Sequence, residues 1–226
     1  MAKRILMVLT SADASGCGGE GSGGFFLAEL VHPFDKFSAA GHTVTICSIA
    51  GGPCHVAAGS LVAPFYDDSC RAFWEGVHKE LTQTTKSLDA YTGTDFDVLF
   101  FVGGFGTMTD FTNNSAVARV GREVYESSGS VAAVCHGPSA LVNIKLTDGT
   151  YLVAGKTLTA FTNEEEAQFG SLPLPDGSCE DLLKSRGAVF EGGAAWSSTV
   201  KQSDRVFTGQ NPASAGALAE AIIASF

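Results

Sequence analysis

The chain has 226 residues, 45% of them hydrophobic and 17% charged, a composition that fits a globular domain with a large core and excludes disordered or fibrous proteins. Its formal net charge of -10 argues against nucleic acid as a partner, because binding to phosphates depends on clustered lysine and arginine. No stretch approaches the roughly 18 consecutive apolar residues of a membrane span. We therefore expect a single domain over residues 1–226, located in the cytoplasm and without a membrane partner.

Short apolar segments alternate along the chain with longer segments of helical spacing. The short ones are rich in Val, Ile, Leu and Phe and end in small or turn residues, so we predict buried strands at Ile5–Leu9, His42–Ser48, Asp97–Gly103 and Ser130–Cys135. The main helices are predicted at Phe25–Ala40, Arg71–Gln83, Ala116–Ser127, Glu180–Ser185 and Ser214–Ser225. This alternation predicts an α/β fold with a doubly wound, mainly parallel sheet between helices, in which ligands bind at the carboxyl ends of the strands.

The first predicted helix carries a carboxylate beside its apolar face. Phe26, Leu30, Phe34 and Phe37 repeat at helical intervals and define the stripe that should be buried. At about 100° per residue, Glu29 lies about 60° from Phe26, at the edge of that stripe. We therefore expect the Glu29 carboxylate to be half-buried or to line a cleft.

The most informative motif is the segment Val131–Pro138, in which an apolar strand runs into Cys135, His136, a glycine and a proline. The proline predicts that a helix starts directly after the cysteine. This pattern is typical of a nucleophile elbow, where helix-start N–H groups stabilise a thiolate and lower the pKa of the thiol. A cysteine that ends a strand can also be an inert core residue, but the residues that follow Cys135 favour the elbow.

Two neighbouring features fit a reactive thiol at Cys135. An elbow can bring the His136 imidazole near the sulfur, where it holds a thiolate or transfers a proton, although a histidine after a strand is about as often a structural hydrogen-bonding residue. After another predicted strand, Gly103, Gly104 and Phe105 can turn backbone amides inward as an oxyanion hole. A tight strand-to-helix turn is the alternative interpretation of these glycines.

Residues 19–24 match the GxGxxG pattern of dinucleotide-binding proteins. About nine residues separate this segment from the first predicted strand, whereas the fingerprint needs a tight turn directly after a strand and an acidic residue after the next one. We therefore expect no cofactor, and a mobile glycine-rich loop beside the active site instead. The six cysteines form no CxxC pair, so we interpret them as thiols, and we predict no metal site.

With these residues in place, the sequence resembles the ThiJ/PfpI superfamily, whose members have the class I glutamine amidotransferase-like fold and include the Parkinsonism-associated deglycase. The chain is most similar to the branch of glutathione-independent glyoxalases (glyoxalase III, D-lactate dehydratase) and heat-shock chaperones. The matching stretches follow the family order along nearly the whole chain: Gly24–Phe34, Gly103–Thr107, Ala132–Ala140, Phe161–Glu166 and Thr208–Ser214. This set is specific for the superfamily and much less so for one substrate.

The resemblance implies a role for each candidate residue. Cys135 would be the nucleophile with Glu29 and His136 beside it, and Glu166 matches the acidic residue that orients the histidine in this branch. The backbone amides of the Gly-Gly-Phe turn would bind the oxyanion. Relatives commonly have a histidine where this chain has Phe105, so a polar group is lost from the pocket wall, which indicates a more apolar substrate.

The resemblance further implies an enzyme that converts methylglyoxal or glyoxal to the hydroxy acid, by thiol attack on the aldehyde and proton transfer through an enediol. The first alternative is a stress chaperone, deglycase or oxidation sensor that uses the same thiol. The second is a cysteine-dependent hydrolase or hydratase that acts on an amide, peptide or isonitrile. The expected partners are a small dicarbonyl substrate and a second copy of the chain in a homodimer.

Overall fold

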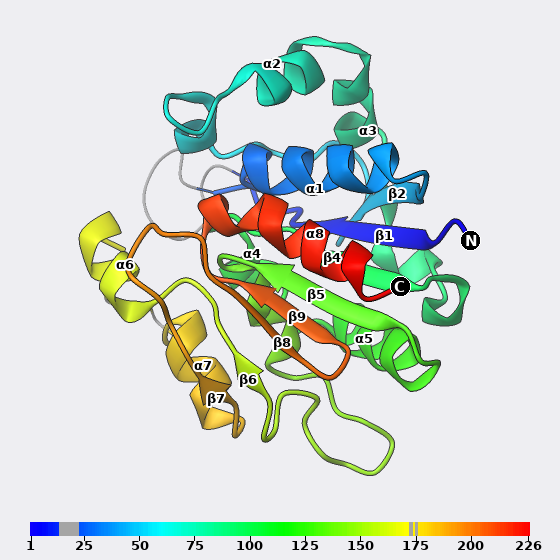
Figure 1. Cartoon of the computed structure of the whole chain (residues 1–226), viewed down its shortest axis with the longest axis vertical. Helices are drawn as coiled ribbons and strands as arrows, with labels where there is room; N and C mark the ends of the chain where they lie inside the picture. Colours follow the sequence, from blue (N-terminus) through cyan, green and yellow to red (C-terminus); the bar gives the residue numbers. More distant parts are fainter. Residues whose placement is uncertain (14–22, 172–173, 175) are drawn as a thin grey trace.

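A computed structural model describes residues 1–13, 23–171, 174 and 176–226. The central sheet has the strand order β3-β2-β1-β4-β5-β9-β8, in which β8 and β9 pair antiparallel and the other neighbours pair parallel (Figure 1). Its strands are β1 Arg4–Leu9, β2 Thr43–Ser48, β3 Lys86–Ser87, β4 Val98–Phe101, β5 Ser130–Val134, β8 Val200–Ser203 and β9 Val206–Gly209. A small second sheet pairs β6 Thr157–Leu158 with β7 Val189–Phe190.

Helices cover both faces of the central sheet. The α-helices are α1 Leu27–Ala39, α2 Asp68–Glu75, α3 Glu80–Gln83, α4 Thr107–Asp110, α5 Ser115–Glu126, α6 Asn163–Phe169, α7 Cys179–Ser185 and α8 Ala215–Ala224. Short 3-10 helices are η1 Ala58–Leu61, η2 Val77–Lys79, η3 Leu88–Ala90, η4 Gly93–Asp95, η5 Gly137–Leu141 and η6 Pro212–Ser214. Figure 1 shows α1 and α8 packed side by side over one face, with α5 on the other. The doubly wound α/β architecture predicted from the sequence is confirmed.

The core lies on both sides of the sheet because successive side chains of a strand point to opposite faces. In β4, Leu99 and Phe101 pack toward α5, whereas Val98 and Phe100 pack toward α1 and α8. Phe100 meets Phe37 of α1 edge to face, with ring centroids 6.0 Å apart. A strand covered on both faces needs a continuous apolar run, which is why these strands could be recognised in the sequence.

Two predictions about the helices need correction. The predicted helix over residues 71–83 is interrupted: α2 ends at Glu75, and a Cβ on Gly76 would collide with the Ala72 carbonyl oxygen. The buried face of α1 is also rotated from the predicted stripe, since Leu27 and Val31 are buried while Phe34 is only partly buried. Among the helices of the described residues, none is both long and apolar enough to cross a membrane.

Candidate active site

Cys135 occupies a strained turn at the carboxyl end of β5. The strand ends at Val134, Cys135 has a φ of 61°, and the 3-10 helix η5 follows with Pro138 in its first turn. A left-handed conformation costs a residue with a side chain about 1–2 kcal/mol, so neighbouring strands must hold it. The Cys135 N–H donates to the Gly209 carbonyl at 2.9 Å, and the Cys135 carbonyl accepts from the Phe161 N–H at 2.9 Å.

A buried hydrogen-bonded chain runs from the sulfur of Cys135 to a carboxylate. His136 Nδ1 lies 3.4 Å from Cys135 Sγ, and His136 Nε2 lies 2.9 Å from Oε1 of Glu166 in α6. Ser171 donates its hydroxyl to the other carboxylate oxygen. Because the carboxylate accepts at Nε2, that nitrogen carries the proton of the neutral ring and Nδ1 is left to accept from the thiol. Glu166 therefore favours the imidazole tautomer with the proton on Nε2, which leaves Nδ1 free to accept a hydrogen bond from the Cys135 thiol.

Glu29 lies close to Cys135, and its carboxyl group is fully buried and does not line the adjacent cavity, so the prediction that it is half-buried or lines a cleft is wrong. A side chain at Gly103 would collide with Glu29 Oε2 and with Cys135, because these two residues meet above that glycine. Neither Glu29 oxygen has a hydrogen-bond partner among the described residues. Burial raises the pKa of Glu29 well above its usual 4.5, and the nearby Cys135 thiol and Gly103 amide, which lie close without full hydrogen-bond geometry, lower it only in part.

The electrostatics of the thiol also differ from the prediction. Burial raises the pKa of Cys135 well above its usual range, and the adjacent Glu29 carboxylate raises it further. The short 3-10 helix η5 does not offset this cost, so the predicted lowering by helix-start N–H groups is wrong. Since desolvation acts on both groups and each negative charge disfavours the other, Cys135 and Glu29 carry at most one negative charge between them near neutral pH.

The glycine turn after β4 forms the wall opposite the elbow. Gly104 has a φ of 113°, and a side chain there would press into the backbone of residues 24–26. Among the described residues, the N–H groups of Gly104 and Phe105 donate to no backbone carbonyl, and both residues line the same cavity as Cys135. Thr107 holds the turn against the elbow, with its hydroxyl 2.9 Å from the Gly104 carbonyl oxygen and 3.0 Å from that of His136.

The thiol faces an apolar cavity of about 470 Å³. Cys135 is only 3% exposed, but it is one of the residues that line this space. Besides Phe105, the aromatic lining consists of Phe26, Phe65, Phe161, Phe169 and Trp196. The His136 ring lies between two of them, with centroids 4.4 Å from Phe161 and 4.9 Å from Phe105. These walls favour a small apolar ligand whose reactive group meets the sulfur.

A third buried carboxylate, that of Glu165, positions one wall of the cavity. Glu165 accepts hydrogen bonds from the Trp196 N–H at 2.8 Å, the Asn211 side-chain amide at 2.8 Å and the Gln210 amide at 3.1 Å. The Trp196 indole N–H donates to Gln168 at 2.6 Å, which ties the ring to α6. Glu165 therefore fixes the loop that places Trp196 beside the cavity and 5.4 Å from the Phe161 ring.

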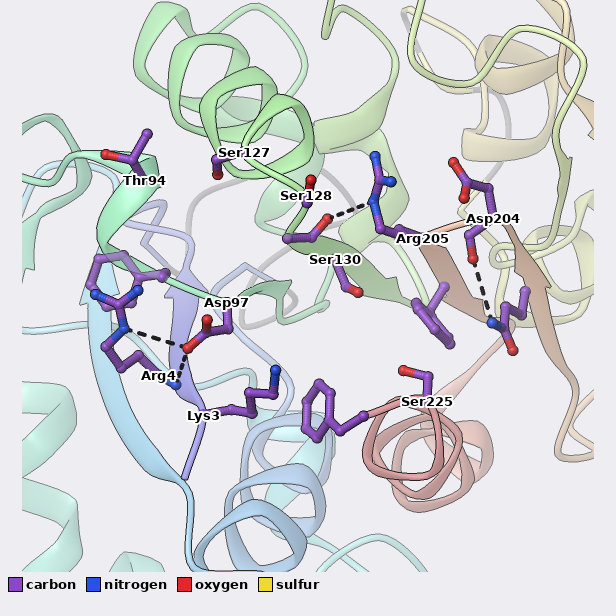
Figure 2. Close-up of a pocket in the computed structure, with 15 residues that line it drawn as sticks. Lys3, Arg4, Thr94, Asp97, Ser127, Ser128, Ser130, Asp204, Arg205 and Ser225 are labelled. Carbon is purple, nitrogen blue, oxygen red and sulfur yellow. Dashed lines mark hydrogen bonds and ion pairs between the residues drawn. The ribbon is translucent and has the colours of Figure 1, made fainter. Parts of the chain in front are cut away.

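Another cavity, of about 430 Å³, lies at the opposite end of the sheet (Figure 2). It surrounds the amino-terminal ends of the strands, where Arg4 pairs with Asp97 at 3.4 Å and Arg205 Nε donates to the Gly129 carbonyl at 3.3 Å. In parallel α/β sheets, ligands bind at the carboxyl ends of the strands. The cavity that contains Cys135 is therefore the better candidate for an active site.

The structure thus brings the candidate residues of the sequence analysis together around Cys135 and His136, although Glu29, Glu166 and Gly103 do not line the cavity. These residues come from four elements: Cys135 and His136 follow β5, Glu29 lies on α1, Glu166 lies on α6, and the turn at residues 103–105 follows β4. Apart from Phe105, the aromatic walls were missed, because their residues are scattered along the chain without a shared pattern. Residues 19–22 of the predicted glycine-rich loop at residues 19–24 lie outside the described residues, as does Cys17. The five described cysteines are free thiols.

Comparison with known proteins identifies relatives that match along most of the chain. The curated relative Glyoxalase 3 of Candida albicans is 28% identical over 235 residues, which cover 99% of this chain and 98% of the relative. Glutathione-independent glyoxalase hsp3101 of Schizosaccharomyces pombe is 31% identical over 216 residues, which cover 88% of this chain and 86% of the relative. These similarities extend over almost the whole domain and are not confined to the cysteine motif.

Solved structures show the same fold at high similarity. Rapid Encystment Protein 24 kDa of Francisella tularensis superposes with a TM-score of 0.93 at 33% identity, covering 99% of this chain and 98% of that one. Glyoxalase III of Candida albicans superposes with a TM-score of 0.92 at 26% identity, covering 99% and 97%. The model of the DJ-1/PfpI family matches residues 23–225. With that match over nearly the full length and the cysteine elbow at the end of β5, the chain belongs to the DJ-1/PfpI family.

Proposed function

We propose that this protein is a glutathione-independent glyoxalase that converts methylglyoxal or glyoxal to the corresponding hydroxy acid. The observation that carries the proposal is the buried Glu29 carboxyl group, which lies against Cys135 and has no hydrogen-bond partner among the described residues. A nucleophile that touches an acid–base group with a raised pKa is what an internal oxidation–reduction of a dicarbonyl requires. The names of the two curated relatives support the same reaction.

The first step is addition of the sulfur to the aldehyde carbon. With Glu29 protonated, the Cys135 thiol gives its proton to His136 Nδ1 as the sulfur forms a bond to the aldehyde carbon. The carbonyl π electrons move to oxygen, and the amides of Gly104 and Phe105 are positioned to stabilise that oxyanion. Glu29 then gives its proton to the oxyanion, which leaves a neutral hemithioacetal and a Glu29 carboxylate.

The second step moves hydrogen between the two carbons. The Glu29 carboxylate removes the proton from the former aldehyde carbon, and the electrons of that C–H bond form the enediolate. The hydroxyl proton moves from the oxygen on the former aldehyde carbon to the oxygen on the former ketone carbon. Glu29 then returns its proton to the former ketone carbon, and the former aldehyde carbon becomes the carbonyl of a thioester. The Glu29 carboxylate then takes a proton from water as the water oxygen bonds to the thioester carbon, and His136 returns its proton to the departing sulfur, which releases lactate from methylglyoxal or glycolate from glyoxal. The overall balance is one dicarbonyl and one water to one hydroxy acid.

The substrate is a small dicarbonyl held by its apolar end. In this arrangement the two carbonyl groups lie between Cys135 and the glycine turn, and the substituent on the ketone carbon contacts the aromatic walls. The cavity of about 470 Å³ is larger than methylglyoxal needs, so substrates with larger apolar substituents also fit.

The decisive test is formation of lactate from methylglyoxal by the purified protein without glutathione. Cys135→Ala should reduce the rate by roughly 10³-fold or more, because it removes the group that forms the covalent intermediate. Cys54→Ala is the matched control, since Cys54 is also a buried thiol but does not line this cavity. Lactate production at the wild-type rate by Cys135→Ala would exclude the proposed role of the thiol.

An oxidation sensor is the second candidate, because the same buried carboxyl group can donate a hydrogen bond to an oxidised sulfur. Mild peroxide treatment followed by mass spectrometry separates the two functions. A protein that serves only as a sensor should gain two oxygen atoms at Cys135 and yet convert no dicarbonyl. An enzyme should form lactate before any oxidation and lose that activity as Cys135 is oxidised.

A further inference from the structure

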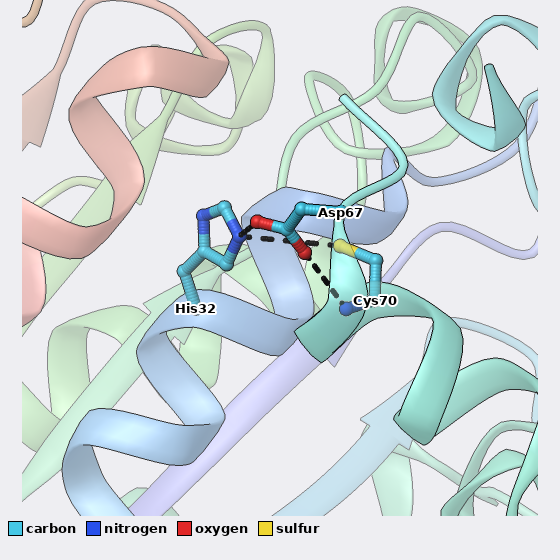
Figure 3. Close-up of side chains that lie close together, drawn as sticks. All are labelled: His32, Asp67 and Cys70. Atoms are coloured by element: carbon cyan, nitrogen blue, oxygen red, sulfur yellow. Dashed lines mark hydrogen bonds and ion pairs between the residues drawn. The ribbon is translucent and has the colours of Figure 1, made fainter. Parts of the chain in front are cut away.

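Three potential metal ligands meet where α1 packs against the start of α2. His32 projects from α1, Asp67 is the N-cap of α2, and Cys70 lies in the first turn of that helix (Figure 3). His32 Nε2 is 2.9 Å from Asp67 Oδ2 and 4.0 Å from Cys70 Sγ. One ligand atom from each residue lies within 4.8 Å of the other two. The three side chains therefore surround a common point.

The chemistry of the three donors is that of a zinc ligand set. Imidazole nitrogen, thiolate sulfur and carboxylate oxygen all bind Zn²⁺ in tetrahedral sites, with a nitrogen–sulfur separation of roughly 3.5 Å expected from the usual bond lengths. The observed 4.0 Å between His32 Nε2 and Cys70 Sγ thus needs a contraction of only a few tenths of an ångström. A set that mixes sulfur and nitrogen disfavours Mg²⁺ and Ca²⁺, which prefer oxygen ligands.

The surroundings leave the cluster accessible on one side only. Cys70 is fully buried, whereas the side chains of His32 and Asp67 are 31% and 48% exposed. His32 also lines a cavity of about 480 Å³ next to the active-site cavity. A metal ion entering from the exposed side would keep one coordination position for water or another small ligand.

The cluster places a buried thiol beside a carboxylate, and a divalent cation would bind the sulfur as a thiolate and neutralise the carboxylate. The Asp67 oxygen that is not directed at His32 remains bonded to the Cys70 N–H at 2.9 Å, so the helix cap and the metal site do not compete for the same atom.

We propose that His32, Asp67 and Cys70 form a binding site for Zn²⁺ or a similar borderline-soft divalent ion. Binding breaks the S–H bond of Cys70 and releases that proton to solvent, and His32 binds through Nε2 with its proton on Nδ1. The ion links α1 to α2 across the intervening chain. His32 lies one turn after Glu29 on α1, so the same ion would also fix the helix that carries the active-site carboxyl group. This proposal does not depend on the glyoxalase reaction.

The test uses Co²⁺ as a spectroscopic probe and Zn²⁺ as its competitor on the full-length protein. We expect one Co²⁺ per chain, with absorption from cobalt–thiolate charge transfer that Zn²⁺ removes. Cys70→Ser should lose this absorption, whereas Cys135→Ser should retain it, which separates the site from the active-site thiol. His32→Gln and Asp67→Asn should each weaken Zn²⁺ binding in calorimetry by at least about 10-fold, because loss of even an indirect partner costs a metal site that much.

Two features of this design keep the result interpretable. Asparagine is as good an N-cap as aspartate, so Asp67→Asn removes the charge without removing the helix cap, and circular dichroism checks the fold of all variants. His78→Gln is the control for a histidine outside the cluster. Absence of the cobalt–thiolate absorption in the wild type, or its persistence in Cys70→Ser, would overturn the proposal. Its loss in Cys135→Ser would do so as well, by assigning the metal to the active site.

Discussion

Replacement of Glu29 by glutamine is the sharpest test of the site, because it removes the acid–base group while keeping its shape. The carboxyl group is fully buried without a hydrogen-bond partner among the described residues, and an unpaired buried charge costs several kcal/mol. Glu29 should therefore be protonated in the folded protein at neutral pH and ionised in the unfolded chain. Glutamine resembles the protonated form, so Glu29→Gln should fold normally.

The wild type should lose stability relative to Glu29→Gln as the pH rises. A raised pKa in the folded state contributes stability that is fully present below the unfolded value near 4.5 and is lost as the pH rises toward the folded value. In that interval the wild type should lose about 1.4 kcal/mol per pH unit relative to Glu29→Gln. Urea unfolding at several pH values between 5 and 8 measures this difference directly. Parallel stability curves would show that Glu29 keeps its ordinary pKa and would refute the reasoning.

The catalytic consequence of the same change is larger. A positioned acid–base group contributes about 10²–10⁴-fold to a rate, so Glu29→Gln should lower kcat for methylglyoxal by that factor, or roughly 3–5 kcal/mol in the barrier. Glu164→Gln is the control, because Glu164 is exposed on α6 and its carboxylate bonds only to Gln168 among the described residues. Wild-type turnover by Glu29→Gln would remove this residue from the mechanism.

Three further predictions concern the surroundings of the thiol and one distant carboxylate. Glu166→Gln should lower kcat by roughly 10²-fold, because the amide can donate to His136 and so stabilise the wrong tautomer; a rate equal to that of Glu164→Gln would contradict this. Phe105→His should lower the ratio of kcat/KM for phenylglyoxal to that for methylglyoxal by about 10-fold, since it replaces an apolar wall with a polar group, and an unchanged ratio would show that this wall does not contact the substrate. Burial raises the pKa of Asp110 from 3.8 to about 6, so its contribution to stability is complete below pH 3.8 and disappears as the pH rises through 6. Between pH 4 and 7 the free energy of unfolding of the wild type should therefore fall by up to about 3 kcal/mol relative to that of Asp110→Asn. A difference that stays constant with pH would argue against the raised pKa.

Local patterns in the sequence were sufficient to predict the scaffold of the site. The apolar runs of β1, β4 and β5 identified a sheet covered on both faces, and the sequence around Cys135 identified a turn directly after β5. The helical spacing of Phe26 and Leu30 placed Glu29 next to the buried face of α1. Each of these inferences depends on residues that are near one another in the chain, where backbone geometry alone relates their positions.

The chemical character of the site could not be predicted in the same way. The raised pKa values of Glu29 and Cys135 result from desolvation by segments that are distant in sequence, including the turn at Gly103. The helix interruption at Gly76 had a sequence signal that the periodicity did not reflect, because a glycine within a helical pattern often marks the end of the helix.

The sequence by itself therefore determined the fold class and the elbow, because these follow from periodicity and turn chemistry within short segments, and with the family resemblance it identified the candidate reactive groups. Only the tertiary structure decided how those groups behave: the aromatic cavity, the full burial of Glu29, and the meeting of His32 with Asp67 and Cys70. The physical reason is that burial and charge interactions depend on all atoms within a few ångströms, and the chain supplies those atoms from segments that come together only when it folds.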